Sequence, residues 1–300
     1  MINISLETHP DLYADYVKCI DFLKLIEEDN YTYPDHTVNY HVYSEVRTDK
    51  ELLCIKSFFA TQNLEKTKLI LWSDWDVTGN EMLQPFKYLI DFRVYDPVNL
   101  ARDTILEGQT KLLLAKDTKH YMMSGMLRFL APFKEGGFWV DMDMILLRDL
   151  VPIMDQEFAY QWGGETDFKG YGPCAAFMNI LPHSEHAMIC LEEVIKAPVR
   201  ADTVSRDCEM LAKVYQRQPF TVFPSPFFNA EWLINKKYPP LGDIVQNGWF
   251  RKTDHSTWLF PESFAWHWHN SAFRKLTIEP GSKFDLLTKM MDAKLKDRGF

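Results

Sequence analysis

The stretch GGFWVDMDMILL, residues 136–147, places two aspartates one residue apart inside an otherwise apolar run. Read as an extended strand, it alternates, because successive side chains of a strand point to opposite faces. The face expected to join the core carries Phe138, Val140, Met142 and Met144. The opposite face carries Trp139, Asp141 and Asp143. Two carboxylates on one face repel each other unless a cation lies near them. The run therefore predicts a Mg²⁺ or Mn²⁺ ion, and with it a phosphate compound.

Strand patterns alternate with helix patterns through the first half of the chain, which is typical of an α/β, doubly wound, mostly parallel sheet. Strands are expected over 38–43, 67–72 and 90–96, ahead of the acidic strand. Helices are expected over 11–28, 48–62 and 80–89, with an interrupted helical segment over 103–134. Ligands of such sheets bind beyond the carboxyl ends of the strands, and both aspartates lie near the end of theirs.

The second half of the chain shows a looser pattern. Its expected strands lie near 157–162 and 174–180, and its expected helices near 184–196, 205–216 and 281–298. No repeat, low-complexity tract or linker divides residues 1–300. We therefore expect a single domain with an elaborated C-terminal half.

Composition narrows the class of protein. An apolar content of 46% predicts an ordered globular chain, and a net charge of −9 argues against binding nucleic acid or an anionic membrane. Five scattered cysteines without a C-x-x-C pair favour reduced thiols over disulfides or zinc. The N-terminus lacks a signal pattern and no apolar run approaches a membrane span, so we expect a soluble, cytoplasmic protein without a transmembrane segment.

An acidic pair by itself is weak evidence for a metal site. With 42 acidic residues in 300, about six acid-x-acid triplets are expected by composition. A rival pair, Asp74 and Asp76, follows the strand over 67–72 and is interpreted as a loop that caps the next helix. For Asp141 and Asp143 the alternative is an edge strand whose carboxylates face solvent.

A helix that precedes the acidic strand adds context to the pair. Ser124 and Arg128 are four residues apart and so share a helical face. Arg128 fits either a structural salt bridge or a donor toward a phosphate or sugar oxygen, and its spacing does not separate the two roles.

These residues together follow the pattern S-x(3)-R-x(7)-G-G-x(3)-D-x-D. The matching residues are Ser124, Arg128, Gly136, Gly137, Asp141 and Asp143. The pattern resembles that of the DXD-motif glycosyltransferases of the GT-A superfamily, in the family 32 group of initiating mannosyltransferases, lactosylceramide galactosyltransferases and clostridial glucosylating toxins. Their usual pattern reads S-D-x-x-R … G-G-x-Y-x-D-x-D, and Trp139 stands at its aromatic position.

Three other segments resemble the same group less closely. HVY, residues 41–43, is similar to the strand that meets the nucleotide base, which implies donor contacts from His41, Val42 and Tyr43. LILWSD, residues 69–74, is similar to the second strand. AWHWHNSAF, residues 265–273, is similar to a C-terminal region whose histidine completes a metal shell. That histidine is His267, with His269 a weaker candidate; a packed aromatic cluster is the alternative for both.

The resemblance implies a GT-A fold, with a nucleotide-sugar-binding half over about 1–150 and an acceptor-binding half over about 151–300. It implies transfer of a hexose or pentose from a UDP- or GDP-sugar to a glycan or other hydroxyl, with retention of configuration. Asp143, Asp141 and His267 would hold Mn²⁺ or Mg²⁺, which neutralises the leaving diphosphate. Asp141 and Arg128 are the implied catalytic pair, and the implied donor-binding residues are Ser124, Arg128, Trp139 and Asp141.

Gly125 departs from the pattern, because the resembling group carries an aspartate there that contacts the donor sugar. Its absence predicts an emptied pocket and a donor that is a deoxy sugar, a pentose or a bulkier sugar. Two other functions stay open: a metal-dependent nucleotidyl or phosphoryl transferase, and a non-catalytic nucleotide-binding relative. The chain shows no P-loop that would favour the former.

Overall fold

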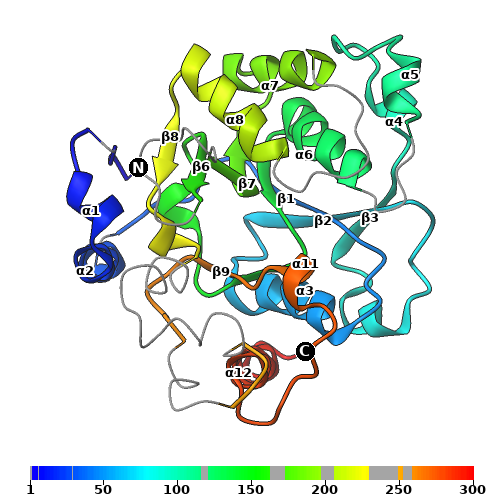
Figure 1. Cartoon of the computed structure of the whole chain (residues 1–300). Coiled ribbons are helices and arrows are strands. Elements are labelled where there is room, and N and C mark those ends of the chain that lie inside the picture. Colours follow the sequence, from blue (N-terminus) through cyan, green and yellow to red (C-terminus); the bar gives the residue numbers. More distant parts are fainter. Residues whose placement is uncertain are drawn as a thin grey trace.

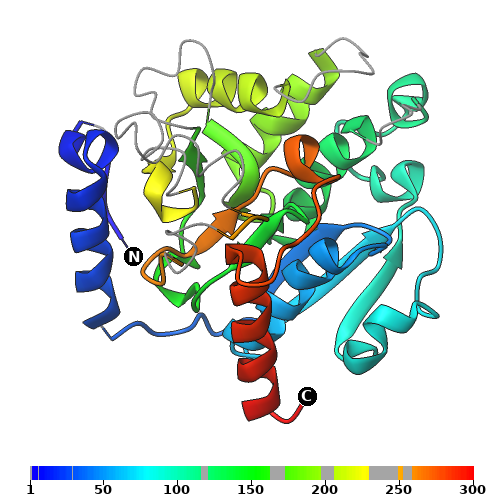
Figure 2. The same cartoon turned by 60° about the horizontal axis from the view of Figure 1, so that its bottom comes forward.

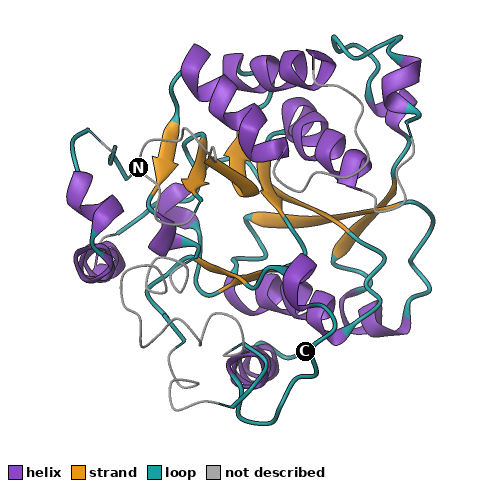
Figure 3. Ribbon diagram, in the orientation of Figure 1, coloured by secondary structure: helices purple, strands orange, loops and turns teal. Residues whose placement is uncertain are grey.

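A seven-stranded sheet forms the centre of the molecule in the computed structural model (Figures 1 and 3). The structure describes residues 2–5, 7–28, 30–115, 121–162, 173–196, 206–229, 249–252 and 259–300. The sheet has the order β3-β2-β1-β4-β7-β6-β8. Its strands are β1 Val38–Tyr43, β2 Thr67–Ser73, β3 Ile90–Val94, β4 Gly137–Val140, β6 Phe158–Gln161, β7 Pro173–Ile180 and β8 Thr221–Phe223.

The sheet is mostly parallel. β1 pairs in parallel with both β2 and β4, β2 pairs in parallel with β3, and β6 pairs in parallel with β8. β7 is antiparallel to its neighbours β4 and β6. The chain thus runs outward from β1 to β3 and returns to the other side of β1 as β4, which makes the β1–β4 boundary a topological switch point. The expected α/β class with a mostly parallel sheet is confirmed.

Helices cover both faces of the sheet (Figure 1). The α-helices are α1 Pro10–Ala14, α2 Tyr16–Glu28, α3 Asp49–Thr61, α4 Pro97–Leu100, α5 Thr110–Leu113, α6 Tyr121–Glu135, α7 Glu185–Lys196, α8 Arg206–Arg217, α11 Asn270–Phe273 and α12 Lys283–Asp297. The 3-10 helices are η1 Glu81–Phe86, η2 Val151–Ile153 and η3 Ser225–Phe227. Helices α6, α7 and α8 lie on one face, and α3 and α12 pack together on the other (Figure 2). No helix among the described residues combines the length and apolar character that crossing a bilayer requires.

Strand β2 shows how the two faces feed two cores. Leu69 and Leu71 join the core on the α3 side, whereas Ile70 and Trp72 join the core beneath α6 and α7. Because a strand sends alternate side chains to opposite faces, a strand buried on both faces reads as a continuous apolar run. This is the pattern of TKLILW in the sequence.

Several expected elements differ in detail. The expected helix over 80–89 is the 3-10 helix η1, which contains Pro85, a residue that interrupts α-helical hydrogen bonding. The expected helix over 11–28 is two helices, with Asp15 extended between them. Strands β8 and β9 (Ala265–His267) were not expected, because three-residue strands give too short a pattern to detect.

The expectation of one strand carrying both aspartates is wrong. β4 ends at Val140, residues 141–143 form a turn, and the chain resumes as β5, Met144–Leu146. The turn is closed by a hydrogen bond from the Met144 amide to the Asp141 carbonyl at 2.9 Å. β5 leaves the main sheet and pairs antiparallel with β9 in a second, two-stranded sheet. The expected alternation therefore stops at Val140, and Met142 is only half-buried.

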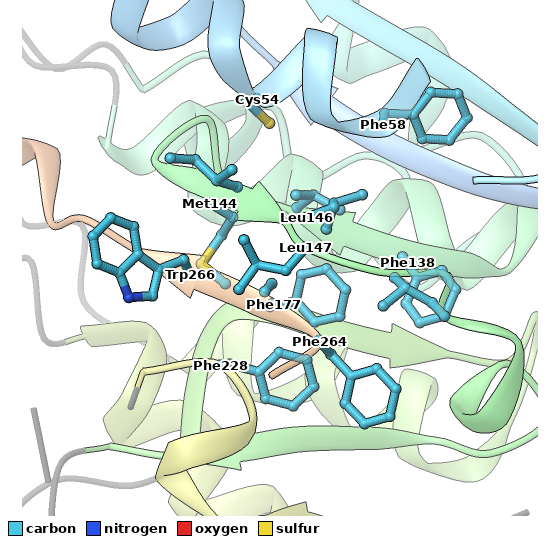
Figure 4. Packing of buried hydrophobic residues seen from close by; sticks show 14 of the residues in the cluster. Cys54, Phe58, Phe138, Met144, Leu146, Leu147, Phe177, Phe228, Phe264 and Trp266 are labelled. Atoms are coloured by element: carbon cyan, nitrogen blue, oxygen red, sulfur yellow. The ribbon is translucent and has the colours of Figure 1, made fainter. Parts of the chain in front are cut away.

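Strand β5 lies in the apolar core between helix α3 and strand β9. Figure 4 shows Met144 and Leu146 lying between α3, which contributes Cys54 and Phe58, and the strand β9 with Trp266. All three residues of β5 are buried. The buried strand β5 thus fixes the C-terminal end of the turn over residues 141–143.

Gly137, the first residue of β4, tests how strictly the backbone sets the position of that turn. Its φ is +100°, and a Cβ there would lie 2.2 Å from the Asn39 carbonyl oxygen on β1. We expect Gly137→Ala to lower the free energy of unfolding by at least about 2 kcal/mol, from the backbone conformation and the clash together.

Gly79→Ala is the matched control for this substitution, because nothing lies within 4 Å of a Cβ at Gly79 and its φ is not positive. It should change the free energy of unfolding by no more than about 0.5 kcal/mol in urea denaturation. Equal effects of the two substitutions would contradict the close packing of β4 on β1.

Candidate functional site

The turn that holds Asp141 and Asp143 lies at the switch point of the sheet. It follows the carboxyl end of β4, next to the carboxyl end of β1 at Tyr43. Asp74 follows the carboxyl end of β2 and accepts a hydrogen bond from the Tyr43 hydroxyl at 2.5 Å. Ligands of open α/β sheets bind in the crevice at such a point. The fold therefore places the acidic turn where a ligand site is expected.

Asp141 is held by two side chains that the sequence analysis had singled out. Trp139 Nε1 donates to its Oδ1 at 2.6 Å, and Arg128 Nη2 lies 3.0 Å from Oδ1 and 3.3 Å from Oδ2. The Arg128 guanidinium also lies 5.5 Å from the centre of the Trp139 ring. Burial raises the pKa of Asp141 to about 6; Arg128 opposes this rise and the charge of Asp143 adds to it. Negative charge is thus incompletely balanced at the turn.

Arg128 has a second carboxylate partner that sequence reasoning missed. Its Nη1 lies 2.9 Å from Oδ2 of Asp207, in the first turn of α8. Burial alone would lower the pKa of Arg128, but Asp141 and Asp207 outweigh it and raise the pKa. An acidic residue in the first turn of a helix is ordinary, since it complements the helix dipole. The sequence therefore carried no signal that distinguished Asp207.

Asp143 is held by the C-terminal segment and not by α6. Its Oδ2 accepts a hydrogen bond from the Asn270 amide at 2.8 Å, and its carbonyl accepts one from the Trp268 amide at 3.0 Å. His267 Nε2 lies 3.3 Å from the same Oδ2. Burial alone would raise the pKa of Asp143, but the charge and hydrogen bond of His267, with the Asn270 amide, lower it to about 2. The carboxylate is ionised at neutral pH.

The two histidines of the C-terminal segment have different surroundings. His267 Nδ1 is hydrogen-bonded to the Tyr160 hydroxyl at 2.8 Å, which directs Nε2 toward Asp143. His269 Nε2 lies 3.2 Å from Asn229 Oδ1, and burial lowers the pKa of His269 well below its ordinary value. The aromatic-cluster alternative also describes this region, since Trp266 is fully buried. His267 thus belongs to a packed cluster and faces Asp143 at once.

The remaining expected donor-binding residues are spread over β1 and α6. His41 is fully buried; its Nδ1 accepts a hydrogen bond from Trp72 Nε1 at 3.2 Å, so its Nε2 donates to the Gly136 carbonyl at 3.0 Å. Both ring nitrogens are therefore used within the protein. Val42 is buried, and Ser124 is half-buried on α6, one turn before Arg128.

A protein-only metal shell is not found in the part of the chain that the structure describes. Within it, no group of three or more His, Cys, Asp and Glu side chains is arranged to hold a metal ion. Two possible metal ligands do lie close together, the Asp143 carboxylate and the His267 imidazole. Carboxylate oxygen with imidazole nitrogen suits Mn²⁺, and the incompletely balanced charge of the turn suits any divalent cation.

Comparison with known proteins identifies the fold. No protein-family model and no curated protein matches the sequence. The solved structure of the glycosyltransferase GlyE from Streptococcus pneumoniae superposes with a TM-score of 0.52 at 11% identity, over 88% of this chain and 64% of that one. The apo structure of the bifunctional glycosyltransferase WbbM gives 0.52 at 10% identity, over 87% of this chain and 51% of that one.

This chain thus spans less than two thirds of the length of either protein. At such identities the similarity establishes the fold alone. The expected GT-A-type α/β fold, shared with glycosyltransferases, is confirmed.

His41 gives a prediction about the pH dependence of folding. Burial lowers the pKa of His41 to about 4, because the charged ring would lose its hydration inside the protein. Between about pH 6.5 and 4 the unfolded chain binds a proton that the folded chain does not, so stability falls as pH falls, by roughly 3 kcal/mol at most from this group.

The variant His41→Gln keeps one acceptor for Trp72 and one donor for Gly136 but does not titrate. In urea unfolding, the stability of the variant relative to wild type should therefore rise as pH falls from about 6.5 to 4, because only wild type loses this contribution. The comparison at pH 8 measures the intrinsic cost of the substitution, since imidazole is neutral there in both states. A variant whose stability falls as steeply as wild type between pH 6.5 and 4 would contradict the prediction.

Proposed function

We propose that this protein is a glycosyltransferase that moves a sugar from a nucleoside-diphosphate sugar to a hydroxyl of a glycan or other acceptor. The observation that carries the proposal is the acidic turn at the switch point between β1 and β4. Its two carboxylates have separate partners, Arg128 for Asp141 and His267 for Asp143. The shared fold with glycosyltransferases supports the same reading.

The Asp143 side of the turn is the proposed diphosphate side. Asp143 and His267 would hold Mn²⁺ or Mg²⁺, with the remaining ligands from the diphosphate and water. When bound, the ion neutralises the charge that develops on the leaving diphosphate. The net charge of −9 favours such a bridge, because an acidic protein otherwise repels an anionic donor. Tyr160 keeps the His267 ring in the orientation that offers Nε2 to this side.

The Asp141 side of the turn is the proposed sugar side. Asp141 would accept hydrogen bonds from the ribose or the transferred sugar, while Arg128 and Trp139 fix its carboxylate in one orientation. Fixed orientation matters because misplaced groups lose most of their effect on the transition state. Arg128 thereby acts in catalysis through Asp141.

The proposed nucleotide side lies over the end of β1. Val42 and Tyr43 stay the candidates for contact with a uridine or guanosine base. His41 precedes them on β1, and its ring is hydrogen-bonded to Trp72 on β2 and to the Gly136 carbonyl. Ser124, on the Arg128 face of α6, remains a candidate for the donor. Retention of configuration, and a cytoplasmic location, are expectations that the sequence resemblance and composition support.

Asp143→Asn tests the proposal directly. The amide oxygen still accepts the Asn270 hydrogen bond, so the fold should persist, but the charge that attracts a cation is lost. We expect hydrolysis of UDP- and GDP-sugars with Mn²⁺ to fall on the order of 100-fold or more. Calorimetry should show weaker UDP or GDP binding with Mn²⁺ and unchanged binding with EDTA.

Asp155→Asn is the matched control, because Asp155 is exposed and far from the acidic turn. It precedes β6, which runs in the same direction as β4, so it lies at the amino ends of these strands, whereas the turn lies at their carboxyl ends. The substitution should leave both readouts as in wild type. Wild-type protein that hydrolyses none of these donors and binds neither nucleotide with Mn²⁺ would overturn the proposed function. Release of pyrophosphate from a nucleoside triphosphate would instead identify a nucleotidyl transferase.

A further inference from the structure

The space next to Gly125 is filled by a carboxylate from another helix. A Cβ at Gly125 would lie 3.2 Å from Oδ1 and 3.8 Å from Oδ2 of Asp207. The expectation of an emptied pocket at Gly125 is therefore wrong. A side chain at position 125 would press against the Asp207 carboxylate, which fits the presence of a glycine at this position of α6.

Asp207 also shares Arg128 with the acidic turn. Arg128 Nη1 lies 2.9 Å from Asp207, and Nη2 lies 3.0 Å from Asp141, so one guanidinium joins α8 to the turn after β4. The arginine side chain is only 9% exposed, whereas the carboxylates are 20% and 26% exposed. What this arrangement presents to a ligand is therefore carboxylate oxygen and not guanidinium.

The charges around Arg128 decide which part of a donor fits here. One arginine faces two carboxylates, so this side of the site carries a net negative charge and repels phosphate. Carboxylate oxygens accept hydrogen bonds from hydroxyl groups, which sugars supply in number. Phosphate is better placed on the Asp143 side, where a cation would balance it.

We propose that Asp207 is a specificity-determining residue that accepts a hydrogen bond from a ring hydroxyl of the transferred sugar. The inference rests on the proposed function and names its substrate class: a donor whose sugar keeps its ring hydroxyls. Asp207 from α8 takes the place that an acidic residue at position 125 would occupy on α6. This reverses the expectation of a deoxy sugar or an otherwise unusual donor.

The experiment compares UDP-glucose, UDP-galactose and GDP-mannose with deoxy analogues that each lack one ring hydroxyl. Hydrolysis with Mn²⁺ gives kcat/KM for each, and calorimetry gives the affinity for UDP or GDP alone. For wild type we expect one parent donor to be preferred over its deoxy analogue, because a site that accepts a hydrogen bond from a hydroxyl discriminates against the analogue that lacks it. Asp207→Asn should reduce that preference at least about tenfold while nucleotide affinity stays within about twofold.

Glu209→Gln is the matched control, since Glu209 is exposed in the same turn of α8. It should leave the preference unchanged. Gly125→Asp alone should impair hydrolysis, because its side chain meets Asp207. The double variant Gly125→Asp/Asp207→Ala moves the carboxylate to α6, three residues before Arg128 and within its reach. It should regain the preference, which a purely structural role of Asp207 would not predict.

The outcomes separate this inference from the proposed function. Active wild type with full preference retained in Asp207→Asn overturns the inference alone. Wild type that hydrolyses no donor overturns the proposed function and this inference with it. If Asp207→Asn does not fold, the double variant decides: a regained preference supports the role of Asp207, and its absence overturns it.

Discussion

Repulsion between two aspartates one residue apart is the constraint on which this site depends. The two carboxylates have different partners. Asp141 is paired with Arg128 from α6, and Asp143 contacts His267 and the Asn270 amide of the C-terminal segment. The turn also connects β4 of the seven-stranded sheet to β5 of the two-stranded sheet. The acidic pair is thereby a structural junction as well as a candidate site.

Helix α3 helps to hold the C-terminal segment that contacts Asp143. Lys50, on α3, donates to the carbonyl oxygens of Phe273, Arg274 and Leu276 at 3.0, 3.0 and 2.6 Å. These carbonyls lie at and beyond the end of α11, where backbone acceptors lack helical partners and a cation complements the helix dipole. The Lys50 ammonium also lies 4.2 Å from the centre of the Phe250 ring. A buried lysine thus holds the C-terminal end of α11, the short helix whose first amide donates to Asp143.

Local pattern predicted the parts of this fold that local physics determines. The alternating and continuous apolar runs predicted β1, β2 and the beginning of β4, and helical spacing placed Ser124 and Arg128 on one face of α6. The pattern failed beyond Val140, where the chain leaves the main sheet. The Asp141 amide still donates to the Ala176 carbonyl of β7, but Asp143 is held by the Asn270 amide and residues 144–146 pair with β9. Asp207 was out of reach of sequence reasoning, because only the packing of α8 beside α6 brings it to Gly125.

The second carboxylate beside Arg128 comes from α8 and not from α6. Asp141 requires a cation and Arg128 requires carboxylates, but neither requires the second carboxylate to come from α6. A carboxylate on α8 satisfies the same guanidinium and occupies the same space, so position 125 is free to become glycine. What is constrained is the charge and the volume beside Arg128, and not the residue that supplies them.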